Sequence, residues 1–327
     1  MLTDITMAKL TAAKAIADDP THWYKGPWSP QPAGAAPWGH ASFYGPQDRV
    51  LKGQRVRDWF AEGAAVISTG RFEPGPVRHE FEDLLLEDQG GASWGMRLYD
   101  VGAGSIFRRV SVVGMGCPGC GKEEGHAFYP NLAPGDTTIE WFRAERCGGQ
   151  ALQAVARSTE AAPGMYPGSG TLRVTNAAAI DCGQLPSRGS WPFSFVTSGH
   201  SYELTNILVA TLGLQPWVDP IWGPSRSRGG ILISDAGNPG EDPSVRTPSA
   251  RLRDVHVVVH SSDRHLAKFK KIDYLDVQGC TFHDFDRGGS ILIEDDVEAG
   301  RWVDVDGNYV IKHRGQTIQG PVDYEWS

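Results

Sequence analysis

The chain has 327 residues, a formal net charge of -8, 40% hydrophobic residues, 40 Gly and 22 Pro. This apolar content is enough for a large core, and so much Gly and Pro favours a fold with many tight corners. The acidic balance includes no run of Lys and Arg, so we expect no nucleic-acid partner. No apolar stretch approaches the roughly 18 residues of a membrane helix, so we expect no membrane insertion.

Two segments precede the regular part of the chain. Residues 1–20 predict a short amphipathic helix, and their lack of a continuous apolar stretch gives no signal-peptide pattern. Residues 21–48 form a Pro/Trp-rich arm, in which Pro excludes regular helix and central strand. Because Trp23, Trp28 and Trp38 are too apolar for a solvated linker, we predict that they anchor the arm against the chain's own flank or another subunit.

Residues 49–75 predict an N-terminal cap for the segment that follows. The stretch VRDWFAEG (56–63) favours a helix, and AAVISTG (64–70) favours a first strand. The stack of repeats described next would need such a cap, because its open end exposes unpaired backbone and apolar side chains. At the other end, residues 316–327 form a short C-terminal tail.

A repeat occupies residues 76–315. Eight segments share the spacing apolar-x-x-apolar-x-apolar, and their starts recur at intervals of 20 to 48 residues. Self-similarity with this kind of period predicts a solenoid. The segments begin at Phe81, Phe107, Ile139, Val174, Leu204, Leu252, Ile272 and Gly300.

Each unit also contains a second short run typical of a strand, such as WGMRL from Trp94 or SILIE from Ser290. Several of these runs follow a Gly pair, and none shows the 3.6-residue period of a helix. Units of this length cannot hold the four strands of a propeller blade. The sequence therefore predicts an all-β fold, a right-handed parallel β-helix of about eight coils.

This register assigns the core. The ninth position of three units is a cysteine (Cys147, Cys182 and Cys280), which we predict to be buried and reduced, acting as a small hydrophobe. The inward side chains predicted from the repeat are Leu84, Leu86, Val110, Val112, Phe142, Ala144, Ile207, Val209, Val255, Val257, Leu275, Val277, Val303 and Val305.

The same register places His256, Asp276 and Asp304 in one outward column on consecutive coils. Stacked coils lie about 5 Å apart, and two carboxylates at that distance match a retaining glycosidase pair. Asp276 and Asp304 are therefore the candidate catalytic residues, with His256 tuning their pKa values. The alternative is a solvated face, on which alternating Arg and Asp form cross-strand ion pairs.

Aromatic residues beside this column are candidates for binding a glycan. Tyr274 and Trp302 flank it, and Trp217 and Trp222 lie in a long loop region between 214 and 250 where binding functions concentrate. Cys117 and Cys120 resemble one zinc knuckle, but a structural zinc site needs four ligands. We therefore interpret them as a turn with two thiols and expect no metal and no cofactor.

Units such as IDYLDVQGCTF (272–282), followed by GGSILIED (288–295), resemble the right-handed β-helix of the pectate-lyase-like superfamily. The resemblance covers about 76–315 and implies the fold without choosing an activity. That superfamily includes polysaccharide lyases, glycosidases and bacteriophage tailspike or minor tail proteins. The calcium-binding Asp set and Arg base of the lyases have no counterpart in this sequence.

The lack of a secretion signal and the aromatic arm favour the bacteriophage group. We therefore expect a virion structural protein that recognises a host-surface polysaccharide and contacts other virion proteins through the arm. The resemblance implies a homotrimer located in the virion. The alternatives are a glycan depolymerase, either a glycoside hydrolase or a lyase, and a non-viral intracellular adaptor.

Overall fold

The computed structural model describes residues 41–43, 49–58, 65–69, 76–88, 94–115, 125–156, 170–184, 191–197, 199–211, 218–219, 223–224, 229–233, 246–259, 265–284 and 288–327. Every regular element in these ranges is a β-strand. The all-β class predicted from the repeat is therefore correct. The helix predicted over 1–20 and most of the 21–48 arm, including its three Trp residues, lie outside the described residues.

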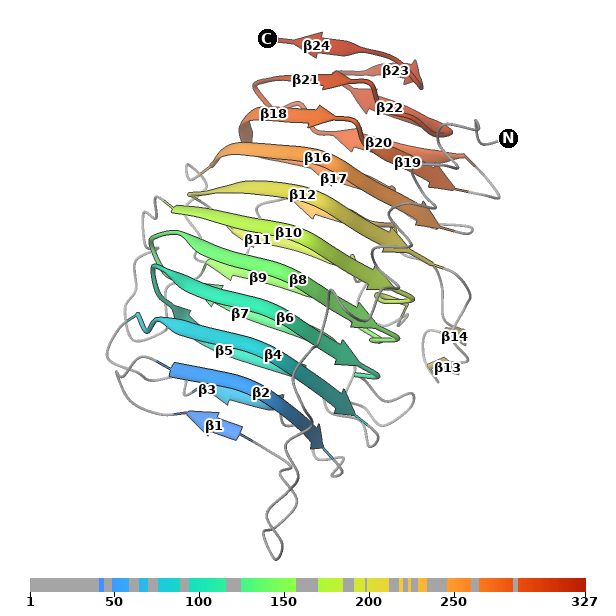
Figure 1. The fold of residues 1–327 in the computed structure, drawn as a ribbon. Helices are drawn as coiled ribbons and strands as arrows, with labels where there is room; N and C mark the ends of the chain where they lie inside the picture. Colours follow the sequence, from blue (N-terminus) through green and yellow to red (C-terminus); the bar gives the residue numbers. More distant parts are fainter. Residues whose placement is uncertain are drawn as a thin grey trace, which may run out of the picture.

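Two large sheets contain nearly all of these strands (Figure 1). The first sheet runs, in spatial order, β1 (Ala41–Phe43), β3 (Ala65–Thr69), β5 (Trp94–Val101), β7 (His126–Leu132), β9 (Leu152–Ala156), β11 (Phe193–Thr197), β15 (Ile231–Ile233), β17 (Ala267–Phe269), β20 (Gly289–Ile293), β22 (Tyr309–His313) and β23 (Gln316–Gln319). The second runs β2 (Arg49–Asp58), β4 (His79–Asp88), β6 (Ser105–Val113), β8 (Thr137–Glu145), β10 (Gly170–Ile180), β12 (His200–Ala210), β16 (Thr247–Val259), β18 (Ile272–Gln278), β21 (Ala299–Val303) and β24 (Tyr324–Trp326), with β19 (Thr281–Asp284) paired to β16.

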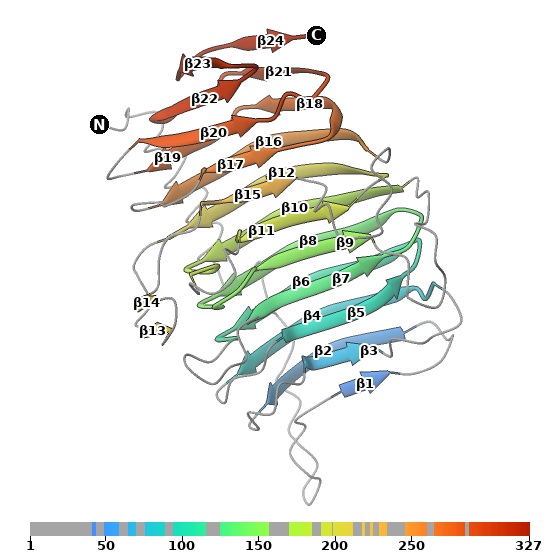
Figure 2. The same cartoon turned by 180° about the vertical axis from the view of Figure 1, so that it is seen from behind.

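The chain alternates between the two sheets. The odd-numbered strands from β1 to β11 belong to the first sheet, and the even-numbered strands from β2 to β12 belong to the second. Neighbours within a sheet are parallel, apart from the pairs made by β23 and β24. Figures 1 and 2 show the result as a stack that rises in chain order, with one sheet on each side. A separate antiparallel pair, β13 (Val218–Asp219) and β14 (Gly223–Pro224), lies apart from both sheets.

One continuous apolar core fills the space between the sheets and runs from Phe81 to Trp326. Thirteen of the fourteen inward side chains predicted from the repeat are buried, each with at most 2% of its surface exposed. The exception is Val303, which is partly exposed. Cys147, Cys182 and Cys280 are buried and free of disulfides, as predicted. Burial raises the pKa of the Cys280 thiol to about 12, so it stays protonated and behaves as an apolar residue.

A left-handed residue bends each long strand of the second sheet near its middle. Asp83, Arg109, Trp141, Asn176, Asn206 and Asp254 all have φ between 52° and 57°. The pairs on either side align these residues in one column across the sheet. Asn, Asp and Gly accept this conformation at the lowest cost, which explains much of the composition of the column.

The column continues through Gly279 and Asp304, with φ of 62° and 49°. At Gly279 the bend separates β18 from β19, although both pair with the one strand β16. Leu252 therefore pairs with Val277, and Val277 with Trp302. The last two repeats begin at these residues, and the starts predicted at Ile272 and Gly300 are wrong. This shift explains why Val303 is not a core residue.

The two ends of the stack differ from the sequence prediction. Val56–Asp58 belong to β2, which pairs in parallel with β4, so the helix predicted from residue 56 does not form over these positions. Pairing along a whole strand outweighs a weak local helix preference. At the other end, the tail 316–327 contains β23 and β24, which add antiparallel to β22 and β21 and cover the last parallel strands.

Candidate functional site

Charged side chains of alternating sign form a ladder on the outer face of the second sheet, which we call the charge column. Neighbouring strands bring these residues into register, so each charge inside the ladder lies between two of opposite sign. The members, in order, are Arg173, Glu203, Arg251, Asp276, Arg301 and Glu325. Directly opposite unlike charges stabilise a strand pair, so the column links the strands along the stack.

Asp276 is the most enclosed member of the charge column. Its side chain is only 4% exposed, and its Oδ1 accepts a hydrogen bond of 3.0 Å from Arg301 Nε. Oδ2 accepts from Arg301 Nη2 at 3.1 Å and also from Arg253 Nη2. Two guanidinium groups therefore surround one carboxylate.

These contacts set the ionisation of Asp276. Burial alone would raise the pKa of its carboxyl group, but the hydrogen bonds and charges of Arg301 and Arg253 outweigh burial and lower it. A glycosidase general acid needs a raised pKa, so that it holds a proton near neutral pH. Asp276 has the opposite property.

The predicted catalytic column does not form. His256 pairs with Leu208 and Thr281 instead of Asp276. Asp304 is an exposed bend residue whose N–H donates to the Asp323 carboxylate at 2.8 Å. Leu252 pairs with Val277, five residues beyond the predicted partner Ile272. The three predicted residues therefore occupy three different columns. The geometric argument for a carboxylate pair is therefore wrong.

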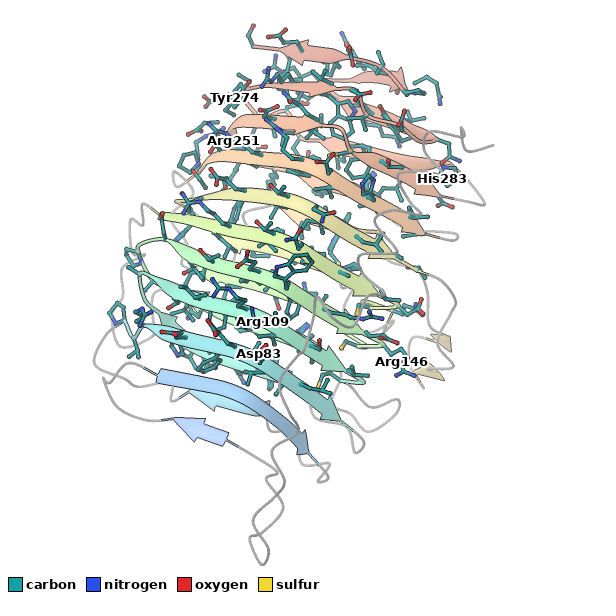
Figure 3. All side chains as sticks on the ribbon, viewed as in Figure 1. Asp83, Arg109, Arg146, Arg251, Tyr274 and His283 are labelled. Carbon is teal, nitrogen blue, oxygen red and sulfur yellow. The ribbon has the colours of Figure 1, made fainter. Side chains whose placement is uncertain are left out.

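The aromatic residues predicted to bind a glycan have different environments. Tyr274 is 37% exposed and lies on the outer surface close to Arg251 (Figure 3). Trp302 is completely buried, and its Nε1 donates to the Tyr309 hydroxyl at 3.0 Å, so it is a core residue and cannot stack on a sugar. Trp217 and Trp222 lie outside the described residues.

The predicted thiol turn at Cys117 and Cys120 also lies outside the described residues. Nearby, His126 is buried, and its Nδ1 accepts a hydrogen bond of 3.0 Å from the Gln150 N–H. Across the ranges that the structure describes, no three His, Cys, Asp or Glu side chains gather in a way that could hold a metal ion. The same ranges contain no helix long and apolar enough to cross a membrane.

A different cluster emerges on the first sheet, around Arg97 of β5. The guanidinium carbon lies 4.1 Å from the centroid of the Trp94 ring, 5.2 Å from that of Tyr99 and 6.0 Å from that of Tyr129. These distances are typical of cation–π contacts. Arg97, its three aromatic neighbours and the adjoining His126 form what we call the arginine–aromatic cluster.

The backbone is irregular at the arginine–aromatic cluster. The pairing of β5 with β7 shifts register between Leu98 and Val101, so Tyr99 lies in a β-bulge. Pro130, which follows Tyr129 in β7, has no N–H to donate to the ladder. Bulges often redirect side chains beside functional sites. Here the bulge accompanies the convergence of the three rings on Arg97.

The sequence pattern of WGMRL (94–98) predicted only a strand and did not indicate this cluster. One signal was available once the strands were aligned. Arg97 lies opposite Ser68 and Tyr129, so neither neighbouring strand offers a carboxylate in register. By contrast, Arg108 lies between Glu82 and Glu140 and pairs with both.

Comparison with known proteins adds no assignment: no protein-family model, curated protein or solved structure matches this chain.

Proposed function

We propose that the chain is a right-handed parallel β-helix, similar to the pectate-lyase-like superfamily, and serves as a structural protein of a bacteriophage virion that recognises a host-surface glycan. A tailspike or minor tail protein is the type that fits best. The observation that carries this proposal is the alternation of the chain between two parallel sheets, with bends and charges aligned in columns. That arrangement supports a stiff, elongated scaffold.

Glycan recognition is favoured over glycan cleavage by the ionisation of Asp276 and the position of Asp304. Asp276 is held ionised by two arginines, and Asp304 lies in another column. A depolymerase needs one carboxyl group that carries a proton and one that does not, close to the same glycosidic bond. Asp276 and Asp304 do not supply that pair.

The proposed assembly is a homotrimer attached to the particle through residues 1–48, with the outer faces of the stack available to the host polysaccharide. Extended solenoid surfaces suit long, repetitive ligands, because equivalent positions recur along the rod. The proposed location is the virion.

Three measurements on the full-length chain test the proposal. Light scattering gives the mass, binding to a panel of bacterial capsular and O-antigen polysaccharides gives recognition, and immunogold labelling of purified particles gives location. We expect a trimer, binding to at least one polysaccharide, labelled particles and no release of reducing ends or unsaturated products. Unlabelled particles from a producing host, or efficient cleavage of the bound polysaccharide, would overturn the proposal.

A further inference from the structure

Arg97 differs from the other arginines of the described residues. Its Nε is buried and makes no hydrogen bond, and no ion pair or hydrogen bond joins Arg97 to a carboxylate or carbonyl of a described residue. Apart from Arg97, every arginine whose side chain the structure describes, from residue 78 onward, faces at least one such oxygen: Arg78, Arg108, Arg109, Arg143, Arg146, Arg173, Arg246, Arg251, Arg253, Arg301 and Arg314. On a chain with a net charge of -8, a cation that pairs with no described carboxylate is an exception that needs a reason.

Ring packing accounts for only part of what this cation needs. The guanidinium carbon lies 4.1 Å from the centroid of the Trp94 ring, a cation–π contact that is weak beside a charged hydrogen bond. The contact leaves the planar edge of the guanidinium without a described acceptor. Trp94 adds a second unused donor, because its Nε1 is also buried without a hydrogen bond. A buried donor with no acceptor is unfavourable, so a ligand that satisfies these groups gains affinity from them.

The donors and rings together define a ligand chemistry. A guanidinium held flat binds a carboxylate through two parallel hydrogen bonds. Aromatic side chains present flat apolar surfaces, and Tyr and Trp add a polar edge. A ligand that matches both has a carboxylate attached to a ring with apolar C–H faces. Sugar acids have this combination, whereas neutral sugars lack the charge and acidic peptides lack the ring.

We propose that the arginine–aromatic cluster binds a carboxylate-bearing sugar residue of an acidic polysaccharide, with Arg97 pairing with the carboxylate and the aromatic side chains contacting the ring. This inference rests on the proposed glycan recognition and names its ligand class. It places the site on the first sheet, away from the charge column. The pairing forms and breaks no covalent bond.

The test measures equilibrium binding of the full-length chain to polygalacturonate, hyaluronan and polysialic acid. Each polymer is compared with its carboxyl-reduced form, and poly-glutamate serves as an acidic polymer without sugar rings. We expect binding to at least one acidic polysaccharide and a loss of at least about tenfold on carboxyl reduction, which corresponds to about 1.4 kcal/mol. Binding should weaken with salt, because ion pairing contributes to it.

Variants assign the binding to the cluster. Arg97→Gln should lose at least about tenfold in affinity, and Arg97→Lys should lose less, because it keeps the charge without the planar fork. Arg251→Gln, which removes an exposed arginine of the charge column, is the matched control and should bind like the wild-type chain. Unchanged circular dichroism and unfolding temperature for Arg97→Lys exclude a loss of fold as the cause.

The outcomes separate this inference from the proposed function. If Arg97→Gln binds acidic polysaccharide as well as the wild-type chain does, the cluster is not the site, while glycan recognition stands. If the chain prefers neutral polysaccharides, or binds poly-glutamate equally well, the proposed ligand class is wrong. If the chain binds no polysaccharide in either panel, both this inference and the proposed recognition fail.

Discussion

Asp276 illustrates how single residues support this fold. Its carboxylate is shared by Arg253 of β16 and Arg301 of β21, so it links three neighbouring strands of the second sheet. An enclosed carboxylate of this kind adds little over an apolar pair, but replacing it leaves Arg253 and Arg301, whose side chains are 32% and 44% exposed, without their shared acceptor. The residue is therefore sensitive to substitution, even though its role is structural.

We expect Asp276→Asn to lower the free energy of unfolding by about 2 kcal/mol, because two partly exposed arginines then lose their charged hydrogen-bond acceptor. Glu325→Gln, at the exposed end of the same charge column, is the control and should cost less than about 1 kcal/mol. Urea denaturation at pH 7 measures both. Equal, small effects for the two variants would show that Asp276 behaves as an ordinary surface ion.

The same contact predicts an acid effect. The pKa of Asp276 is lower in the folded chain than the value of about 4 in an unfolded chain. Its contribution is complete above the unfolded value and is lost as the pH falls through the folded one. The difference in stability between the wild-type chain and Asp276→Asn should therefore shrink as the pH falls below about 4. A constant difference from pH 7 to pH 2 would contradict the assignment.

His200 predicts a second pH effect, with a different origin. The ring is buried, its Nε2 lies 3.2 Å from the carbonyl oxygen of Ala133, and its Nδ1 has no hydrogen-bond partner. Burial lowers the pKa of His200, although the Ala133 carbonyl and the charge of Asp136 act in the opposite direction. The neutral ring, with its proton on Nε2, fits this environment.

Because the unfolded chain takes up a proton near pH 6.5 and folded His200 does so only at lower pH, stability falls as the pH drops through that value. We expect a loss of at most about 1.4 kcal/mol between pH 7.5 and 5.5 that is absent in His200→Gln, whose amide can still donate to Ala133. Urea midpoints at the two pH values measure the effect. An identical pH dependence in the variant would assign the loss to other groups.

At the scale of the strand, the left-handed bend is the element that repeats most faithfully. Asn176 and Asn206 occupy it on neighbouring strands, and Asn206 Nδ2 donates to Asn176 Oδ1 at 2.7 Å. The side chains therefore form a short ladder along the bend, in addition to tolerating the backbone conformation. Asp83 and Arg109 form a comparable pair at the same position, with Arg109 Nε 2.5 Å from Asp83 Oδ1 (Figure 3).

Two substitutions at Asn206 separate the backbone from the ladder. Asn206→Gly loses only the side-chain hydrogen bond, which costs about 1 kcal/mol. Asn206→Ala loses that bond and also carries the strain of a left-handed non-glycine residue, about 1–2 kcal/mol. We therefore expect Ala to be more destabilising than Gly by about 1 kcal/mol or more in chemical denaturation. The reverse order would mean that packing at the bend, instead of backbone strain, determines the cost.

The bend also explains which part of the fold the sequence could predict. The apolar spacing identified the strands of the first six repeats correctly, because each has one apolar start that fits. In the seventh repeat, the segment VQGCTF from Val277 matches the apolar spacing as well as the segment IDYLDV from Ile272 does. The spacing alone cannot choose between starts five residues apart. The third position favours Val277, because Gly279 adopts a left-handed backbone at lower cost than Tyr274 would.

That choice had a large effect on the candidate site. Outward columns follow directly from the register, so the shift of the seventh start from Ile272 to Val277 and of the eighth from Gly300 to Trp302 separated His256, Asp276 and Asp304 and brought Trp302 into the core. The prediction of buried residues was affected only at Val303, because many positions of an alternating strand are apolar in either register. The arginine–aromatic cluster depends on a β-bulge in β5 and on which strands are neighbours, and neither feature is encoded in a local pattern.

At the scale of the whole molecule, the stack must end without offering an open sheet edge. Unpaired edges of parallel sheets are templates for association with other chains. The C-terminal end is closed by β23 and β24, which reverse direction and pair with β22 and β21. Trp326 of β24 packs so closely over Gly300 that a Cβ at that glycine would lie 2.6 Å from its ring.

Removing residues 316–327 should therefore expose two strand edges and part of the core around Trp302 and Tyr309. We expect the truncated chain to associate into species larger than the full-length assembly and to unfold at a lower temperature, as measured by light scattering and thermal denaturation. Trp326→Ala keeps the edge strands but removes a mostly buried ring, and should cost about 3–5 kcal/mol. Tyr274→Ala, which removes an exposed ring from the neighbouring surface, is the control and should change stability by less than about 0.5 kcal/mol. If the truncated chain keeps both the mass and the unfolding temperature of the full-length chain, the two strands are not a protective cap, and closure of this end must come from another part of the assembly.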